Sequence, residues 1–179
     1  MHRRKLLALI AEYADRHPEE AAIVARFQEF IDSHERCFAR DCWAGHITGS
    51  AWLVDPSQNS ILLTHHKKLG IWVQLGGHSD GDPDTASVAY KEATEESGLS
   101  VDFLDQAIFD LDIHEIPARK NDPAHYHFDV RFQFIAASRD YTVSEESHDL
   151  SWIEIERLPE VTQETSMLRM RQKWLAAHG

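Results

Sequence analysis

The segment that most constrains the fold of this chain runs from Gly76 to Leu99 and reads GGHSDGDPDTASVAYKEATEESGL. The glycine pair that opens it is expected to end a short apolar strand. An Asp- and Gly-rich loop follows, where Asp82 is a good N-cap and Pro83 suits the first helical position. Gly98 favours a left-handed C-terminal cap with a hydrophobic residue after it. We therefore predict a helix over residues 83–97, entered directly from a strand.

Acidic residues crowd the wrong end of this predicted helix. Glu92, Glu95 and Glu96 are spaced i, i+3 and i+4, so their carboxylates converge on one patch. Like charges at this spacing cost about 0.2–0.5 kcal/mol per pair, and the helix dipole disfavours anions in the last turn. Lys91 offsets only part of this repulsion through an i, i+4 pair with Glu95. A hard divalent cation bound between the carboxylates would relieve this repulsion and would also bind phosphate oxygens. The alternative interpretation is an acidic helix surface that is only solvated.

The stretch from Gly77 to Leu99 resembles the Nudix box, the signature of hydrolases that act on nucleoside diphosphates linked to another moiety. The positions that match in register are Gly77, Glu92, Ala93, Glu95, Glu96, Gly98 and Leu99. Two positions depart, because Pro83 stands where the first glutamate is expected and Lys91 replaces the arginine. The resemblance implies a Nudix-like α/β/α sandwich with a mixed β-sheet.

The same resemblance implies roles for individual side chains. Glu92 and Glu96 are the implied principal ligands of Mg²⁺ or Mn²⁺, and Glu95 is a further ligand or the base. Because lysine lacks the planar, two-pronged donor of arginine, Lys91 is expected to hold a neighbouring carboxylate more loosely. The residues that we assign to substrate binding are Gly77, His78 and Lys91. For His78, a solvated loop histidine is the competing interpretation.

A second group of acids lies near the end of the chain, in the segment SEESHDLSWIEI. Nudix relatives often carry a glutamate in a comparable late loop, where it binds metal or activates water. We assign Glu146 to this catalytic role, with Glu145 as the alternative residue. A plain acidic loop is the competing interpretation.

The first 35 residues predict two helices, because apolar residues recur at helical spacing on both sides of His17-Pro18. The residue before a proline is pushed out of the helical conformation, so the chain is expected to turn there. We interpret residues 1–40 as a helical extension that packs as a cap, although a partner-binding or homodimer-forming hairpin is the alternative. Residues 43–179 then form the catalytic core of a single domain.

Beyond residue 43, β-like stretches alternate with turn signals. The segments 44–55 and 60–66 flank the turn cluster 56–59 and predict a hairpin. The further elements that we predict are strands over 71–75, 107–116 and 125–137 and a last helix over 163–177. Strands framed by helices over this length indicate an α/β or α+β sandwich.

The two later strands carry alternating polar residues on one face. If they pair as a hairpin, that face brings His114 near His125 or His127. One interpretation is a cleft wall or a second metal site, for which histidine and aspartate ligands suit zinc. The other is the solvent-facing side of an ordinary sheet.

The net charge, the apolar stretches and the cysteine content limit the classes of partner that we expect. The 179 residues include 18 Lys plus Arg and 30 Asp plus Glu, a formal net charge of −12, which argues against an extended nucleic-acid surface or an anionic membrane. No apolar stretch approaches the roughly 20 residues needed to span a bilayer. Cys37 and Cys42 are too few for a disulfide framework. We therefore expect a cytoplasmic protein with reduced thiols and a small-molecule diphosphate substrate.

These observations predict a metal-dependent hydrolase that cleaves a diphosphate linkage, with Mg²⁺ or Mn²⁺ as its cofactor. The principal alternative is a catalytically weak or inactive Nudix-fold protein that binds a nucleotide or a sugar phosphate. Two further alternatives are an isomerase of isoprenoid diphosphates built on the same fold and a structural module whose N-terminal helices bind a partner. The sequence does not choose among nucleotide sugars, dinucleotides, oxidised nucleotides and coenzymes as substrates.

Overall fold

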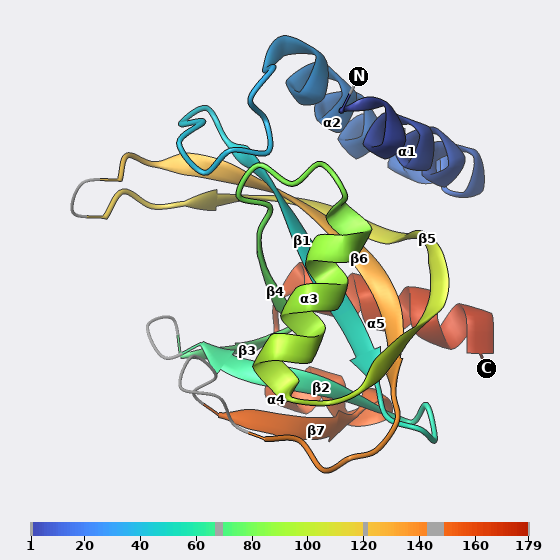
Figure 1. The fold of residues 1–179 in the computed structure, drawn as a ribbon. Helices are drawn as coiled ribbons and strands as arrows, with labels where there is room; N and C mark the ends of the chain where they lie inside the picture. Colours follow the sequence, from blue (N-terminus) through green and yellow to red (C-terminus); the bar gives the residue numbers. More distant parts are fainter. Residues whose placement is uncertain (1, 67–69, 120–121, 143–148, 179) are drawn as a thin grey trace.

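The computed structural model describes residues 2–66, 70–119, 122–142 and 149–178. The chain begins with helices α1 (Arg4–Arg16) and α2 (Ala21–Ser33), joined by the short 3₁₀ helix η1 (Pro18–Glu20). The predicted break before Pro18 is confirmed, because His17 ends α1 with a non-helical backbone. The two helices lie side by side along one edge of the molecule (Figure 1).

A mixed β-sheet forms the centre of the described part of the chain. Its strands are β1 (His46–Val54), β2 (Ser60–His66), β3 (Ile71–Val73), β4 (Leu75–His78), β5 (Val101–Ile116), β6 (His125–Ala136) and β7 (Leu150–Glu154). The order is β3-β2-β1-β6-β5, with β4 paired to β1 and β7 paired to β2. Strands β1 and β6 run parallel, whereas the other pairs are antiparallel. The predicted β1–β2 hairpin is confirmed. Strands β5 and β6 also pair antiparallel, the condition on which His114 was expected near His125 or His127, although β5 begins at Val101 and not near residue 107.

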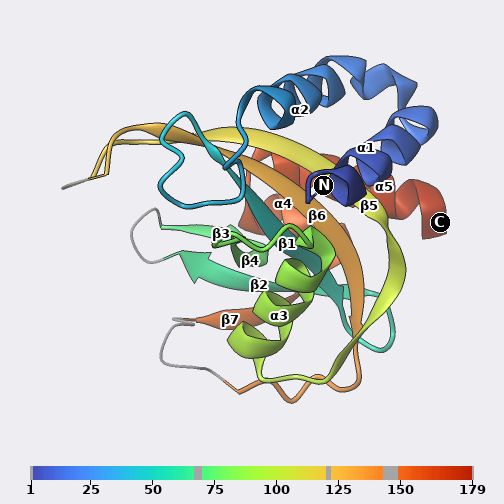
Figure 2. The ribbon, with the colours of Figure 1, turned by 45° about the horizontal axis from the view of Figure 1, so that its top comes forward.

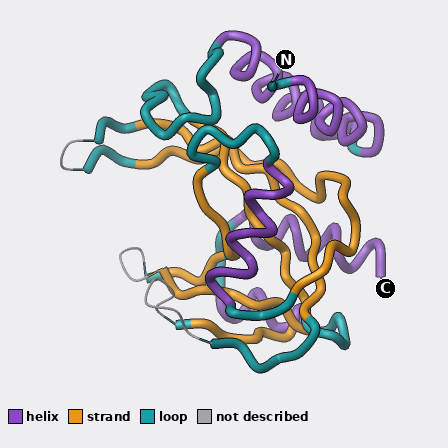
Figure 3. The backbone as a smooth tube through the Cα atoms, in the orientation of Figure 1, coloured by secondary structure: helices purple, strands orange, loops and turns teal. Residues whose placement is uncertain are grey.

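Helices cover both faces of this sheet (Figures 1 and 3). Helix α3 (Thr85–Ser97) lies on one face, and α5 (Thr165–His178) lies on the other. The 3₁₀ helix η2 (Ile155–Arg157) and helix α4 (Leu158–Val161) connect β7 to α5. The structure therefore has the α/β/α sandwich predicted from the sequence.

Alternation along β1 divides the apolar side chains between two cores. Ala51 and Leu53 belong to the core under α3, whereas Trp52 packs with Trp174 of α5 in the second core. The N-terminal helices join the first core, where Phe30 stacks on Phe128 of β6 with ring centroids 3.8 Å apart. Figure 2 shows these helices next to β5 and β6. This packing is that of a cap on the core.

Two details of the predicted strand–helix segment are corrected. The glycine pair does not end the strand, because Gly76 and Gly77 lie within β4 and pair with β1. The helix begins at Thr85, not at residue 83, and its N-cap is Asp84, whose carboxylate accepts a hydrogen bond from the Ser87 backbone N–H. The Gly98 cap is confirmed by its positive φ of 66°.

Among the described residues, no helix combines the length and the apolar character needed to cross a membrane.

Candidate functional site

The carboxylate site comprises Glu92, Glu95 and Glu96 of α3 and the glycine pair of β4. Two of its acids are turned toward the strand. The backbone N–H of Gly76 donates a hydrogen bond to Oε1 of Glu96 at 3.2 Å. A Cβ placed on Gly77 would lie only 2.5 Å from the carboxyl carbon of Glu92. The strand can approach these carboxylates so closely because it has no side chain at Gly77.

The third acid lies on the open side of the helix. The Glu95 side chain is 62% exposed, and its Oε2 lies 3.9 Å from Nζ of Lys91, which is 65% exposed. The predicted i, i+4 pair is therefore present, but such an exposed pair contributes little to stability. Lys91 therefore places an exposed positive charge beside Glu95.

The loop between β4 and α3 contains Pro83, at the position where the Nudix signature has its first glutamate. Pro83 lies between Asp82, whose Oδ1 accepts a hydrogen bond from the Asp84 backbone N–H at 2.9 Å, and Asp84, which caps α3. Nζ of Lys5, from the N-terminal extension, lies 2.5 Å from Oδ2 of Asp84. The loop is thus organised by the cap and by α1. Glu145 and Glu146 lie outside the described residues.

A second group of polar side chains, the histidine cluster, comprises His46, His78, His114, His125 and His127. Strand register explains why they meet. His46 of β1 is paired with His127 of β6, and His114 of β5 is paired with the same His127. Paired residues share a face of the sheet, so the rings come together. The predicted proximity of His114 to His127 is confirmed, with ring centroids 5.3 Å apart.

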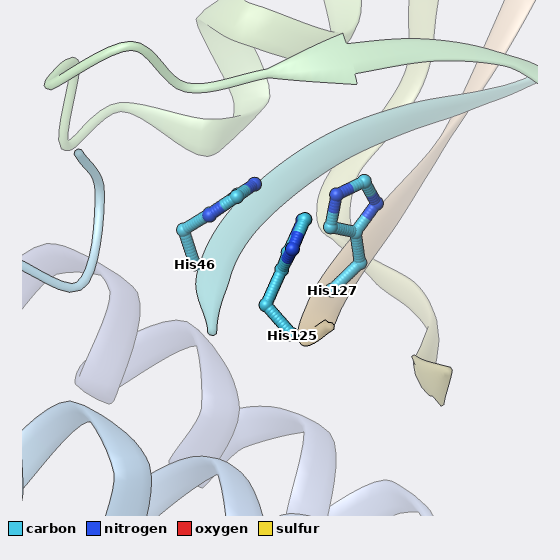
Figure 4. A group of neighbouring side chains, drawn as sticks. All are labelled: His46, His125 and His127. Carbon is cyan, nitrogen blue, oxygen red and sulfur yellow. The ribbon is translucent and has the colours of Figure 1, made fainter. Parts of the chain in front are cut away.

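Three of these rings form the centre of the cluster (Figure 4). The ring centroid of His46 lies 4.9 Å from that of His125 and 4.8 Å from that of His127. The His78 ring lies 5.0 Å from those of both His46 and His127. His46 and His125 are almost completely buried, with 1% and 8% of their surface exposed.

Burial controls the charge of these imidazoles. Burial, followed by the neighbouring His78 and His125, lowers the pKa of His46 to about 4. Burial, followed by His78 and His114, lowers the pKa of His127 to about 3. Both rings are therefore neutral at neutral pH, and each keeps one nitrogen lone pair.

The carboxylate site and the histidine cluster lie on opposite faces of β4. Gly77 faces Glu92 of α3, whereas the next residue, His78, joins the histidine rings. Successive residues of a strand point to opposite faces, so the sequence neighbours reach different environments. The predicted site residues Gly77, Glu92 and Glu96 are brought together, while the His78 ring lies on the far side of the strand.

Beyond the histidines, the same face carries a buried charge network. Arg131 is 2% exposed and pairs with Asp110 at 3.0 Å and Asp129 at 2.7 Å. Arg169 and Lys173 of α5 also reach Asp110, each at 2.7 Å. This network fixes α5 to the sheet. The alternation of charged residues in β5 and β6 indicated a polar face, but it did not indicate this network, because Arg169 and Lys173 come from a distant helix.

Comparisons with known proteins identify the fold. No family model matches the sequence, and no curated protein matches it. A hydrolase of the NUDIX family from Clostridium perfringens matches 74% of this chain and 97% of its own, with 23% identity and a TM-score of 0.52. The MutT protein from Methanosarcina mazei Go1 matches 76% of this chain and 97% of its own, with 14% identity and a TM-score of 0.57.

A third solved structure, the Ap4A hydrolase of C. elegans, matches 74% of this chain and 96% of its own, with 15% identity and a TM-score of 0.53. At these identities the likeness concerns the fold. The chain has the Nudix fold, as the resemblance of its sequence implied.

Proposed function

We propose that this Nudix-fold protein is a metal-dependent hydrolase that cleaves the diphosphate linkage of a nucleoside diphosphate joined to another moiety. The observation that carries the proposal is the close approach of Glu92 and Glu96 to the glycine pair of β4. The shared fold of solved Nudix hydrolases supports the reaction class. The catalytic unit is residues 43–179, with residues 1–40 as its cap.

The donor set of the carboxylate site fits a hard divalent cation. Three carboxylates project from one helix end, and carboxylate oxygens are the ligands that Mg²⁺ and Mn²⁺ prefer. Glu92 and Glu96 would hold the ion from the side facing β4, and Glu95 would complete the set from the exposed side. When bound, the ion polarises the diphosphate and lowers the pKa of a bound water.

Side chains of the protein supply the proton transfer and the further positive charge that the reaction needs. Glu95 or Glu146 removes a proton from the attacking water, provided that its carboxylate lies within hydrogen-bond reach. Lys91 contributes a positive charge that can move from Glu95 to a phosphate oxygen, because both side chains are exposed. The missing side chain of Gly77 leaves room for the acids beside the strand.

The test is a metal-dependent screen of a diphosphate panel that includes nucleotide sugars, dinucleotides, oxidised nucleotides and coenzymes, with release of phosphate or nucleoside monophosphate as the readout. We expect Glu96→Gln to lower turnover at least about 100-fold, because loss of residues that only support a metal ligand already costs 10–100-fold. Glu29→Gln is the matched control, since Glu29 is exposed on α2. Equal turnover of Glu96→Gln and the unmodified protein would contradict the proposal.

A second function is favoured by one observation. Pro83 replaces the first glutamate of the signature, and Lys91 makes only an exposed pair with Glu95. Both departures weaken the acidic site and are compatible with a protein that binds a nucleotide or a sugar phosphate without cleaving it. Calorimetry that shows tight ligand binding without metal-dependent product would support this alternative.

A further inference from the structure

We propose that His46, His125 and His127 form a binding site for a zinc ion, separate from the carboxylate site. One nitrogen from each of these rings lies within 4.8 Å of the other two. The side chains come from the first residue of β1 and from two same-face residues at the start of β6, and they converge in Figure 4. The inference does not depend on the proposed hydrolase activity.

Unpaired buried nitrogens are the strongest observation for this site. His46 is 1% exposed, and neither of its ring nitrogens makes a hydrogen bond of normal geometry within the described part of the chain, although the Cys42 backbone acts on its pKa. Nε2 of His127 likewise makes no such hydrogen bond there. Leaving a buried polar atom without a partner costs about 1–3 kcal/mol. An ion between the rings would turn one nitrogen of His46 and Nε2 of His127 into ligands, and the other His46 nitrogen would remain an N–H.

A hydrogen bond already orients the third imidazole. Nδ1 of His125 donates to the backbone carbonyl of Pro123 at 2.8 Å. In the neutral ring this bond fixes the proton on Nδ1 and leaves the Nε2 lone pair available. Histidine ligands of zinc characteristically donate their other N–H in this way, which fixes both the tautomer and the ring orientation.

The chemistry of the donors selects the ion. Imidazole nitrogens suit zinc and other late transition metals, whereas Mg²⁺ prefers oxygen ligands. Tetrahedral coordination with Zn–N bonds of 2.0–2.1 Å places ligand nitrogens about 3.3 Å apart. The nitrogens lie within 4.8 Å of one another, so each pair would have to close by about 1.5 Å at most when the ion binds.

The fourth position has a histidine beside it. The His78 ring lies 5.0 Å from the rings of both His46 and His127. His114 is less suited, because its side chain is 40% exposed. An ion held by His46, His125 and His127 would connect the starts of β1 and β6, with His78 or water in the fourth position. With His78 as the fourth ligand, the ion would also connect these strands to β4.

The test uses the full chain, freed of metal with a chelator and then titrated with ZnCl₂ against a chromophoric zinc chelator. Millimolar MgCl₂ is present throughout to occupy the carboxylate site. We expect one zinc ion per chain in the unmodified protein and at least 100-fold weaker binding in His127→Asn. His65→Asn is the matched control, because His65 packs against Trp72 outside the cluster. Zinc binding in His65→Asn and Glu96→Gln is expected to be unchanged.

A second measurement keeps the proposal testable if His127→Asn fails to fold by circular dichroism. X-ray absorption of the zinc-loaded, unmodified protein would show imidazole nitrogens at 2.0–2.1 Å. An oxygen-only coordination shell would overturn the proposal. Zinc affinity in folded His127→Asn equal to that of the unmodified protein would overturn it as well, as would loss of zinc binding in Glu96→Gln.

Discussion

The carboxylate site and the histidine cluster share strand β4 but have opposite physical character. The first gathers acids of like charge at the surface of a helix end, with Glu95 62% exposed. The second gathers imidazole rings around His46, which is 1% exposed. The first brings like charges together, whereas the second leaves ring nitrogens of His46 and His127 without a hydrogen bond of normal geometry among the described residues. The alternation between Gly77 and His78 would allow one short strand to support both the proposed carboxylate metal site and the proposed zinc site.

The largest expected effect separates the two sites by the metal that each binds. We expect free zinc at about 1,000 times its Kd to raise the free energy of unfolding by about 4 kcal/mol. His127→Asn, with at least 100-fold weaker binding, is expected to reduce this gain to about 1.4 kcal/mol or less, whereas Glu96→Gln is expected to keep it. Any gain from Mg²⁺ is expected to show the reverse dependence. The measurement is denaturant unfolding in chelator, in ZnCl₂ and in MgCl₂.

This pair of variants also serves as its own control, because each removes one site and leaves the other. A zinc effect that disappears in Glu96→Gln and persists in His127→Asn would mean that the carboxylates bind zinc. The distinction between the two regions would then be wrong.

The second prediction tests whether the faces of β4 act independently. In Gly77→Ala, the new methyl group would lie 2.5 Å from the carboxyl carbon of Glu92 and displace it. Because small misplacements at a reacting centre can cost about 100-fold, we expect turnover to fall by about 10- to 100-fold. Zinc affinity is expected to stay unchanged, because His78 points to the other face. Parallel losses of turnover and zinc affinity would show that the sites are coupled through the strand.

The third prediction uses a buried polar group that is well paired, as a reference for the unpaired histidines. Asp55, in the turn between β1 and β2, accepts hydrogen bonds from the Asn59 and Ser60 backbone N–H groups, both at 3.0 Å, and from Arg139 at 2.7 Å. Burial alone would raise the pKa of Asp55, but these bonds outweigh burial and lower it. We expect Asp55→Asn to lose about 2 kcal/mol of stability at pH 7, because hydrogen bonds to charged groups contribute about 1.5–3 kcal/mol each.

The sign of the pH dependence follows from that lowered pKa. The stabilisation by Asp55 is fully present above the unfolded pKa of about 3.9 and is lost as pH falls through the lower folded value. The difference between Asp55→Asn and the unmodified protein is therefore expected to be largest at neutral pH and to shrink below about pH 4. Denaturant unfolding across this range measures it, and a difference independent of pH would contradict the assignment.

Local patterns predicted the elements of the fold well. Apolar spacing located α1 and α2, and polar alternation in β5 and β6 brought His114 to His127. Where the prediction failed, the cause was a close approach between distant segments. The glycine pair reads as a strand end because glycine weakens strands, but in the fold it makes room for Glu92 and for β1.

The position of His46 could not be obtained from local pattern either. Its pairing with His127 arises from the parallel register of β1 and β6. These two strands are far apart in the sequence, because β2 to β5 and α3 lie between them. Parallel neighbours are joined by long connections, and no turn signal fixes their register. The carboxylates of α3 were predictable because their spacing lies within one helix, whereas the histidine cluster required the tertiary fold.

The smallest expected effect tests the unpaired state of His46 directly. In His46→Leu, an apolar side chain of similar volume replaces a ring whose nitrogens have no hydrogen-bond partner among the described residues. Removing an unsatisfied buried group is neutral or stabilising, so we expect a gain of about 1 kcal/mol in chelator. The matched control is His34→Leu, because Nδ1 of His34 donates to the Phe30 carbonyl at 3.0 Å and its replacement is expected to destabilise the protein.

In saturating zinc the order of stability of His46→Leu and the unmodified protein reverses, since only the unmodified protein gains the binding free energy. A His46→Leu variant that is less stable in chelator and equally stabilised by zinc would show that His46 is an ordinary core residue.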